Sequence, residues 1–172
     1  MPDVLVVNAS PLIFLANVGR LDLLRAIGAP RVVVPDAVYD EVTDARHADA
    51  VARALSAAPW VERFAPIAVP TSVIEWDLGP GESAVIAAGL QIARCRVVID
   101  DLNGRKCSLA LGVDVMGTLG VVIAAYRRGQ IADPRQLLLE MRASGMWLAD
   151  SVIERALRLA GVDPDPTPPA GF

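Results

Sequence analysis

The chain has 172 residues, enough for one domain that buries a core without disulfides or structural metals. Its net charge of −4 argues against a protein that coats nucleic acid non-specifically, although a local basic patch can still bind phosphates. The longest uncharged apolar stretches, 83–93 and 115–126, fall short of the roughly 18 residues of a membrane span, and the start has no basic region typical of a signal peptide. We therefore expect a cytoplasmic protein with no membrane partner.

Short runs of β-branched and apolar residues recur along the chain and predict four or five parallel strands, buried on both faces of one sheet. In chain order these runs are 4–7, 31–34, 60–64, 96–99 and 113–116. The helical patterns between them supply the right-handed crossovers that parallel strands need. The predicted fold class is therefore α/β, as a single domain over 1–160, followed by a proline-rich disordered tail over 161–172.

Helix signals separate the predicted strands. After the first strand, Ser10 and Pro11 supply an N-cap and a first-turn proline. Residues 79–83 form a sharp start to a helix that is apolar nearly all round and is therefore expected to be buried. Ser151 and Glu154 have the spacing of a capping box at the start of the last helix, whereas residues 65–78 look irregular. Further helices are expected near 21–27, 36–45, 48–58, 101–111, 117–126 and 134–142.

Polar side chains gather where the predicted strands end. Asn8 ends the first strand, and Asp100 and Asp101 end the fourth. Since the carboxyl ends of parallel strands lie at one edge of the sheet, Glu82 and Glu41 can reach the same edge if the strand order reverses around the first strand. Carboxylates held this close repel one another unless a hard cation lies between them, and Mg²⁺ or Mn²⁺ suits such oxygen ligands.

Each of these residues also has an interpretation that needs no metal. Glu82 lies in the first turn of a helix, where its charge favours the helix dipole. One residue of the pair Asp100 and Asp101 is expected to be an N-cap. Glu41 taken alone is a solvated charge. The case for a metal therefore depends on all of them meeting.

Histidine and cysteine offer no alternative centre. The only histidine, His47, falls in a polar helix start and is too isolated for a catalytic triad. Cys95 and Cys107 stand twelve residues apart without the CxxC spacing of a metal or redox site. We expect both cysteines to be buried free thiols.

Five short motifs occur in order: VVNASPLI at 6–13, PDAVYDEV at 35–42, LGPGES at 78–83, VIDD at 98–101 and GTLG at 117–120. With these motifs the chain resembles the PIN-domain superfamily over residues 4 to about 160, and more narrowly a prokaryotic branch related to VapC-type toxins. The resemblance implies a three-layer α/β/α sandwich with a central parallel sheet, an acidic pocket that binds Mg²⁺ or Mn²⁺, and metal-dependent endoribonuclease activity on RNA. It also implies a homodimer and, for a toxin, a small antitoxin that plugs the site.

The resemblance also implies roles for individual residues. The family's four acidic positions fall in order on Asn8, Glu41, Glu82 and Asp101, with Asp100 beside the last as a further metal ligand. The hydroxyl-bearing positions around the pocket match Ser10 and Thr118. Arg105 and Lys106 follow the acidic pair and are placed to hold the RNA backbone, although a solvated helix turn explains them equally well.

Asn8 departs from the family pattern, since catalytically typical members carry aspartate there. The missing unit charge is worth about 8 kcal/mol near a divalent ion before desolvation is counted, and much of it returns because an amide is cheaper to bury. We therefore expect weaker metal binding. The alternative function is a catalytically attenuated PIN-like protein that acts as an RNA- or antitoxin-binding module. A phosphoacceptor receiver domain ranks lower, because its acidic pair should follow the first strand.

Overall fold

The computed structural model describes residues 2–44, 48–65 and 68–162. In this part of the chain the strands form a five-stranded sheet, and every pair in it is parallel. The order across the sheet is β3-β2-β1-β4-β5. The strands are β1 (Val4–Val7), β2 (Arg31–Pro35), β3 (Val61–Phe64), β4 (Cys95–Val98) and β5 (Asp114–Met116). The prediction of a parallel α/β sheet is confirmed.

The central strand is β1, where the strand order reverses. The chain passes from β1 to β2 and β3 on one side, then returns to the other side for β4 and β5. Val4 accordingly pairs with Arg31 of β2 and with Cys95 of β4. All four residues of β1 are buried, as expected for a strand covered on both faces. In such sheets ligands bind beyond the carboxyl ends at the reversal point, which here lies between β1 and β4.

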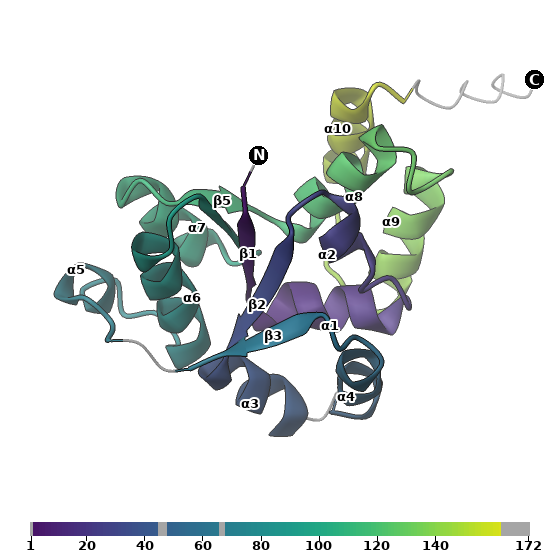
Figure 1. Cartoon of the computed structure of the whole chain (residues 1–172). Helices are drawn as coiled ribbons and strands as arrows, with labels where there is room; N and C mark the ends of the chain where they lie inside the picture. The colour runs from purple at the N-terminus through teal and green to yellow at the C-terminus, as the bar shows by residue number, and fades with distance from the viewer. Residues whose placement is uncertain (1, 45–47, 66–67, 163–172) are drawn as a thin grey trace, which may run out of the picture.

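Helices cover both faces of the sheet. Figure 1 shows α6 and α7 on one side and α1, α2 and α8 on the other, with α9 and α10 packed outside α8. This is the expected three-layer α/β/α sandwich. The helices are α1 (Ala9–Asn17), α2 (Leu23–Ala26), α3 (Asp36–Asp44), α4 (Ala48–Ser56), α5 (Thr71–Ile74), α6 (Pro80–Gln91), α7 (Leu102–Ala110), α8 (Thr118–Arg127), α9 (Pro134–Ala143) and α10 (Asp150–Ala160).

The helix α6 is the buried helix that its composition predicts. Its residues 85–88 are fully buried, and it packs against β1, β2 and β4. Its first turn faces the carboxyl edge of the sheet, where it also meets α3. The burial of this helix therefore fixes the position of Glu82 relative to the ends of β1 and β4. Within the described residues, no helix is long and apolar enough to cross a membrane.

Two predicted caps are wrong. Ser10 lies inside α1, which begins directly at Ala9, because the N–H of Asn8 still donates to the sheet at Val98 O, 3.0 Å away, and the helix starts immediately afterwards. At α10 the N-cap is Ala149, without a side-chain cap. Glu154 instead accepts a hydrogen bond from Arg135 at 2.6 Å, and this charged pair outcompetes the predicted capping box with Ser151.

The remaining boundaries agree with the expectations in part. The segment predicted to be irregular contains the short helix α5. Near the end of the chain, Gly161 terminates α10 in the left-handed conformation and Val162 packs against the core. The rest of the predicted tail, 163–172, lies outside the described residues, as does His47.

Candidate functional site

Asn8 lies at the carboxyl end of β1 with an unsatisfied side chain. The residue is 5% exposed, and its Oδ1 is a buried oxygen that has no hydrogen-bond partner among the described residues. It occupies the N-cap position of α1 but makes no side-chain cap. Leaving a buried acceptor unpaired costs about 1–3 kcal/mol, so a native structure that retains one has a reason for it. A bound ligand that supplies positive charge would satisfy this oxygen.

The side-chain oxygens of Glu41 and Asn8 both lie close to Gly81. Gly81 is the second residue of α6, and a Cβ at this position would lie 2.7 Å from Glu41 Oε2 and 3.4 Å from Asn8 Oδ1. Val38, one turn before Glu41 on α3, also lies against this glycine. The missing side chain at Gly81 therefore lets two oxygens from different elements approach the first turn of α6.

Glu82 connects this pair to the end of β4. Burial raises the pKa of the Glu82 carboxyl, the negative charge of Asp101 raises it further, and Glu41 adds a smaller contribution in the same direction. A backbone hydrogen bond from Gly79 opposes the rise. Asp101 and Glu41 therefore both lie close enough to Glu82 to disfavour its ionised form. A partly buried carboxylate with two acidic neighbours is a candidate for a functional site.

The acidic pair after β4 separates into two roles. Asp101 is the N-cap of α7, and its Oδ1 accepts from the N–H groups of Asn103 at 2.7 Å and Gly104 at 2.9 Å. This confirms that one member of the pair is an N-cap. Asp100 turns toward α8 and accepts from the N–H of Thr118 at 2.8 Å and from its hydroxyl at 2.6 Å. Asp101 is therefore the member of the pair that acts electrostatically on Glu82, whereas Asp100 links the end of β4 to the start of α8 by hydrogen bonds.

The other predicted site residues lie around this edge. Thr118 is fully buried and reaches the site through Asp100. Ser10 is half-buried in the first turn of α1, two residues beyond Asn8. Arg105 and Lys106 are exposed on α7. Arg105 Nη1 and Asp100 Oδ1 both lie about 3 Å from where a Cβ on Gly117 would be. The guanidinium of Arg105 therefore lies beside the acidic edge, by which we mean the carboxyl edge of the sheet with Glu41, Glu82, Asp100 and Asp101.

The side-chain oxygens at the acidic edge are the type of ligand that hard divalent cations bind. Among the described residues, no group of three or more acidic, histidine or cysteine side chains is gathered closely enough to hold a metal ion. However, Mg²⁺ is commonly bound through only one or two carboxylates, with water and substrate phosphate completing its shell. The unpartnered Asn8 oxygen and the mutual repulsion at Glu82 are both relieved by such an ion. The oxygens present therefore suit Mg²⁺ or Mn²⁺.

Sequence reasoning missed the glycines that shape this edge. Gly81, Gly104 and Gly117 each have a site side chain within 4 Å of where a Cβ would stand. The available signal was the placement of a glycine inside the first turn of two predicted helices and at the start of a third. A glycine in a helix is unfavourable by about 1 kcal/mol relative to alanine, so its presence there indicates a close approach.

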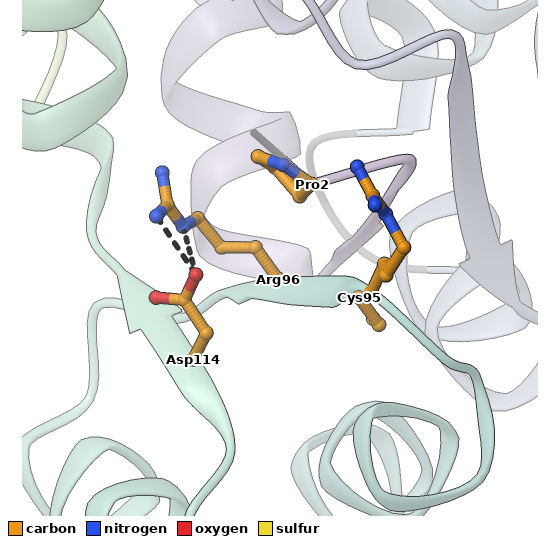
Figure 2. Close-up of a pocket in the computed structure, with 5 residues that line it drawn as sticks. Pro2, Cys95, Arg96 and Asp114 are labelled. Atoms are coloured by element: carbon orange, nitrogen blue, oxygen red, sulfur yellow. Dashed lines mark hydrogen bonds and ion pairs between the residues drawn. The ribbon is translucent and has the colours of Figure 1, made fainter.

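A cavity lies at the opposite, amino edge of the sheet. It has a volume of about 400 Å³ and is lined by Pro2, Arg94, Cys95, Arg96 and Asp114 (Figure 2). Arg96 pairs with Asp114 at 2.7 Å, and Arg94 pairs with Asp3, also at 2.7 Å.

The thiol in this cavity is unreactive. Burial, together with the charge of Asp114, raises the pKa of Cys95 to about 11, so the thiol is protonated at neutral pH. As expected, Cys95 and Cys107 are both free and buried. The amino-edge cavity thus offers balanced charge and an inert thiol, and the acidic carboxyl edge is the better candidate site.

The fold and the acidic edge define a three-layer α/β/α protein with oxygen ligands at the reversal point of its sheet. Residues 4–162 match the sequence model of a family described as a PIN domain, DUF3368. The chain belongs to the PIN-domain family, which confirms the resemblance of its motifs to the PIN-domain superfamily. PIN domains are generally nucleases, so this is a nuclease-type fold. Comparison with curated proteins gives no match.

Proposed function

We propose that the protein is a metal-dependent endoribonuclease that hydrolyses RNA phosphodiester bonds with Mg²⁺ or Mn²⁺. One observation carries the proposal: Glu82 has Asp101 and Glu41 as acidic neighbours, and Glu41 approaches Gly81 together with the buried, unpartnered oxygen of Asn8. This cluster lies at the carboxyl edge of a nuclease-type fold. RNA is the substrate that a PIN domain suggests.

The residues that would hold the ion are Glu82 and Asp101, with Glu41 completing the charge and Asn8 as a neutral ligand. Asp100 lies next to them and remains a candidate ligand, since each carboxylate oxygen has more than one lone pair. A bound divalent cation supplies an activated water and stabilises charge on the phosphoryl oxygens. The exposed cations Arg105 and Lys106 would bind the RNA backbone near this edge.

Asp100 and Thr118 have a supporting role in this scheme. Their two hydrogen bonds hold the end of β4 against the start of α8, and so keep the backbone that carries Asp101 in place. Gly81 and Gly104 leave the room that Glu41 and Glu82 need. These contacts position the oxygens before any ligand arrives, which reduces the reorganisation needed on binding.

The finer biological role that we propose is the toxin of a toxin–antitoxin pair. It is supported by the resemblance of the motifs to VapC-type proteins. In this role the protein would form a homodimer and would be inhibited by a small antitoxin that covers the acidic edge. Co-purification of the chain with the product of an adjacent small gene, followed by loss of cleavage in the complex, tests this role.

The enzymatic proposal is tested by RNA cleavage in the presence of Mn²⁺. We expect cleavage by the purified chain that is abolished by a chelator and falls at least about 100-fold in Glu82→Ala and Asp101→Asn. Glu75→Ala is a matched control, because this exposed glutamate at the end of α5 lies outside the acidic edge. Equal cleavage by all four proteins would reveal a contaminant, and the proposal would then be abandoned.

A second candidate function is an attenuated PIN protein that binds RNA or an antitoxin without cleaving. It is favoured by Asn8, whose amide oxygen brings no charge to the site. Asn8→Asp separates the two: a gain of more than about ten-fold in cleavage indicates a naturally attenuated site. If Asn8→Asp and the natural chain cleave RNA at the same substantial rate, asparagine is a competent ligand.

A further inference from the structure

Another cavity, of about 230 Å³, lies beside the acidic edge. Its walls are largely apolar and include Ala37 at the start of α3, Phe64 at the end of β3, and Pro80 and Ala84 in the first turns of α6. Two polar side chains, Asp36 and Ser83, also line it. The cavity therefore combines flat apolar walls with a small number of hydrogen-bonding groups, as binding sites for aromatic ligands do.

The cavity and the acidic edge share two helices. On α3, Ala37 of the cavity and Glu41 of the acidic edge are four residues apart, which places them on the same helix face about 6 Å apart along the axis. On α6, Ser83 of the cavity directly follows Glu82. Because α3 packs against both α6 and β3, the cavity and the acidic edge are built from neighbouring parts of the same elements.

We propose that this cavity binds a nucleobase of the RNA whose phosphate is cleaved at the acidic edge. This inference rests on the proposed function and names the part of the substrate that the site selects. RNA bases that are splayed out of a single strand stack on aromatic and apolar side chains, and Phe64 offers such a face. In this proposal the base in the cavity and the phosphate at Glu82 belong to the same or neighbouring nucleotides, because Ser83 of the cavity adjoins Glu82 in the chain.

Asp36 gives the cavity a preference among bases. Its Oδ1 accepts a hydrogen bond from Arg63 Nε at 2.8 Å, and this ion pair fixes the carboxylate at the cavity wall. An ionised carboxylate only accepts hydrogen bonds, so it favours a base with an amino group, such as cytosine. Uracil presents a carbonyl oxygen at the same position and is repelled. The cavity therefore selects cytosine over uracil.

The test measures nucleotide binding without cleavage. Cytidine monophosphate and uridine monophosphate are titrated separately into the isotope-labelled full chain without divalent metal, and backbone amide shifts are followed by NMR. We expect shifts at Ala37 and Ala84, with cytidine monophosphate bound about ten-fold more tightly. Ala84→Leu fills the cavity and should abolish these shifts. Ala143→Leu, at an exposed alanine of α9, makes the same change elsewhere and should retain them.

A second variant keeps the proposal testable if Ala84→Leu does not fold. Asp36→Asn preserves the shape of the side chain but supplies an amide that can donate to the uracil carbonyl. We expect the preference for cytidine monophosphate to disappear or reverse. Equal binding of both nucleotides to the natural chain, or binding that survives Ala84→Leu, overturns the inference. Amide shifts confined to the acidic edge would overturn it as well.

Failure of this inference is distinguishable from failure of the proposed function. Mn²⁺-dependent cleavage that shows no base preference and is unchanged in Asp36→Asn would overturn the base cavity while supporting the nuclease. Selective cytidine monophosphate binding without any RNA cleavage would support the cavity and remove the nuclease. Both assays use the same purified proteins, so the two results can be compared directly.

Discussion

Two groups of carboxylates, one at each edge of the sheet, differ in the charge of their neighbours. At the amino edge each of three carboxylates has an arginine partner: Asp3 with Arg94, Glu62 with Arg31 and Asp114 with Arg96. At the carboxyl edge Glu82 instead has the like charges of Asp101 and Glu41 as neighbours. Glu62 and Glu82 are the same residue type, yet the pKa of Glu62 is lowered, chiefly by its hydrogen bonds to Arg31, whereas that of Glu82 is raised by burial and like charge.

We interpret this difference as one between charges that are paired within the fold and charges that, in the proposed function, bind a ligand. Exposed ion pairs such as Arg31 with Glu62 contribute little, but they leave no charge uncompensated. A cluster of like charges in a partly buried position lowers stability and persists when function requires it. The contrast predicts that substitutions at the two edges will change stability and activity in different directions.

The largest effect is expected at Asp101, whose N-cap and whose negative charge can be removed separately. Asp101→Asn keeps the N-cap, because asparagine caps as well as aspartate, but removes the charge. We expect thermal stability that is equal or slightly higher, because the charge that disfavours Glu82 is removed, with RNA cleavage reduced at least about 100-fold. Asp101→Ala should lose the same activity and also about 1 kcal/mol of stability, since the N–H groups of Asn103 and Gly104 lose their acceptor. Urea unfolding and a cleavage assay on both variants measure this. Full activity in Asp101→Asn would remove Asp101 from the site.

A smaller effect is expected from Gly81→Ala. The new methyl group would lie 2.7 Å from Glu41 Oε2, so the flexible end of this glutamate must move away. We expect about a ten-fold loss of cleavage with little change in stability, because misplacing a ligand by about 1 Å is costly to catalysis. The control is Gly120→Ala on α8, whose methyl group would contact only the flexible side chain of Met116. Equal losses in both variants would point to a general effect of helix substitution.

Matched glutamate-to-glutamine changes compare the edges directly. At neutral pH and without metal, Glu82→Gln should raise the melting temperature, because it removes a charge that burial and Asp101 disfavour. Glu62→Gln should lower it slightly, because it removes the pair with Arg31. Thermal unfolding followed by circular dichroism checks both signs. Shifts in the same direction would contradict the distinction between the two edges.

The effect at Glu62 has a defined pH dependence. Its folded-state pKa is lowered, so its contribution to stability is present above the unfolded pKa and is lost as the pH falls through the folded pKa. The melting temperatures of the natural chain and Glu62→Gln should therefore differ at neutral pH and converge in acid, below that lowered pKa. A difference that persists unchanged at the lowest pH would show that the pair is not its origin.

The fold was largely predictable because parallel strands buried on both faces leave continuous apolar runs in the sequence. Convergence of Asn8, Glu82 and Asp101 at one edge then follows from topology. The divergence of Asp100 from Asp101 was not predictable, since it depends on Thr118 reaching back from α8. The predicted cap at Glu154 failed because Arg135 arrives from another helix. Local patterns therefore predicted which side chains gather at the carboxyl edge, but contacts between distant elements decided the partners of each side chain.

The smallest effect concerns the thiol at the amino edge. Because burial raises the pKa of Cys95 to about 11, very little thiolate exists in the folded chain at mildly alkaline pH. Iodoacetamide should therefore label Cys95 and the buried Cys107 much more slowly in the native protein than in urea, as measured by mass spectrometry. RNA cleavage should survive Cys95→Ser, because this residue lies at the opposite edge from the carboxylates. Loss of cleavage in a folded Cys95→Ser variant would mean that the two edges are coupled.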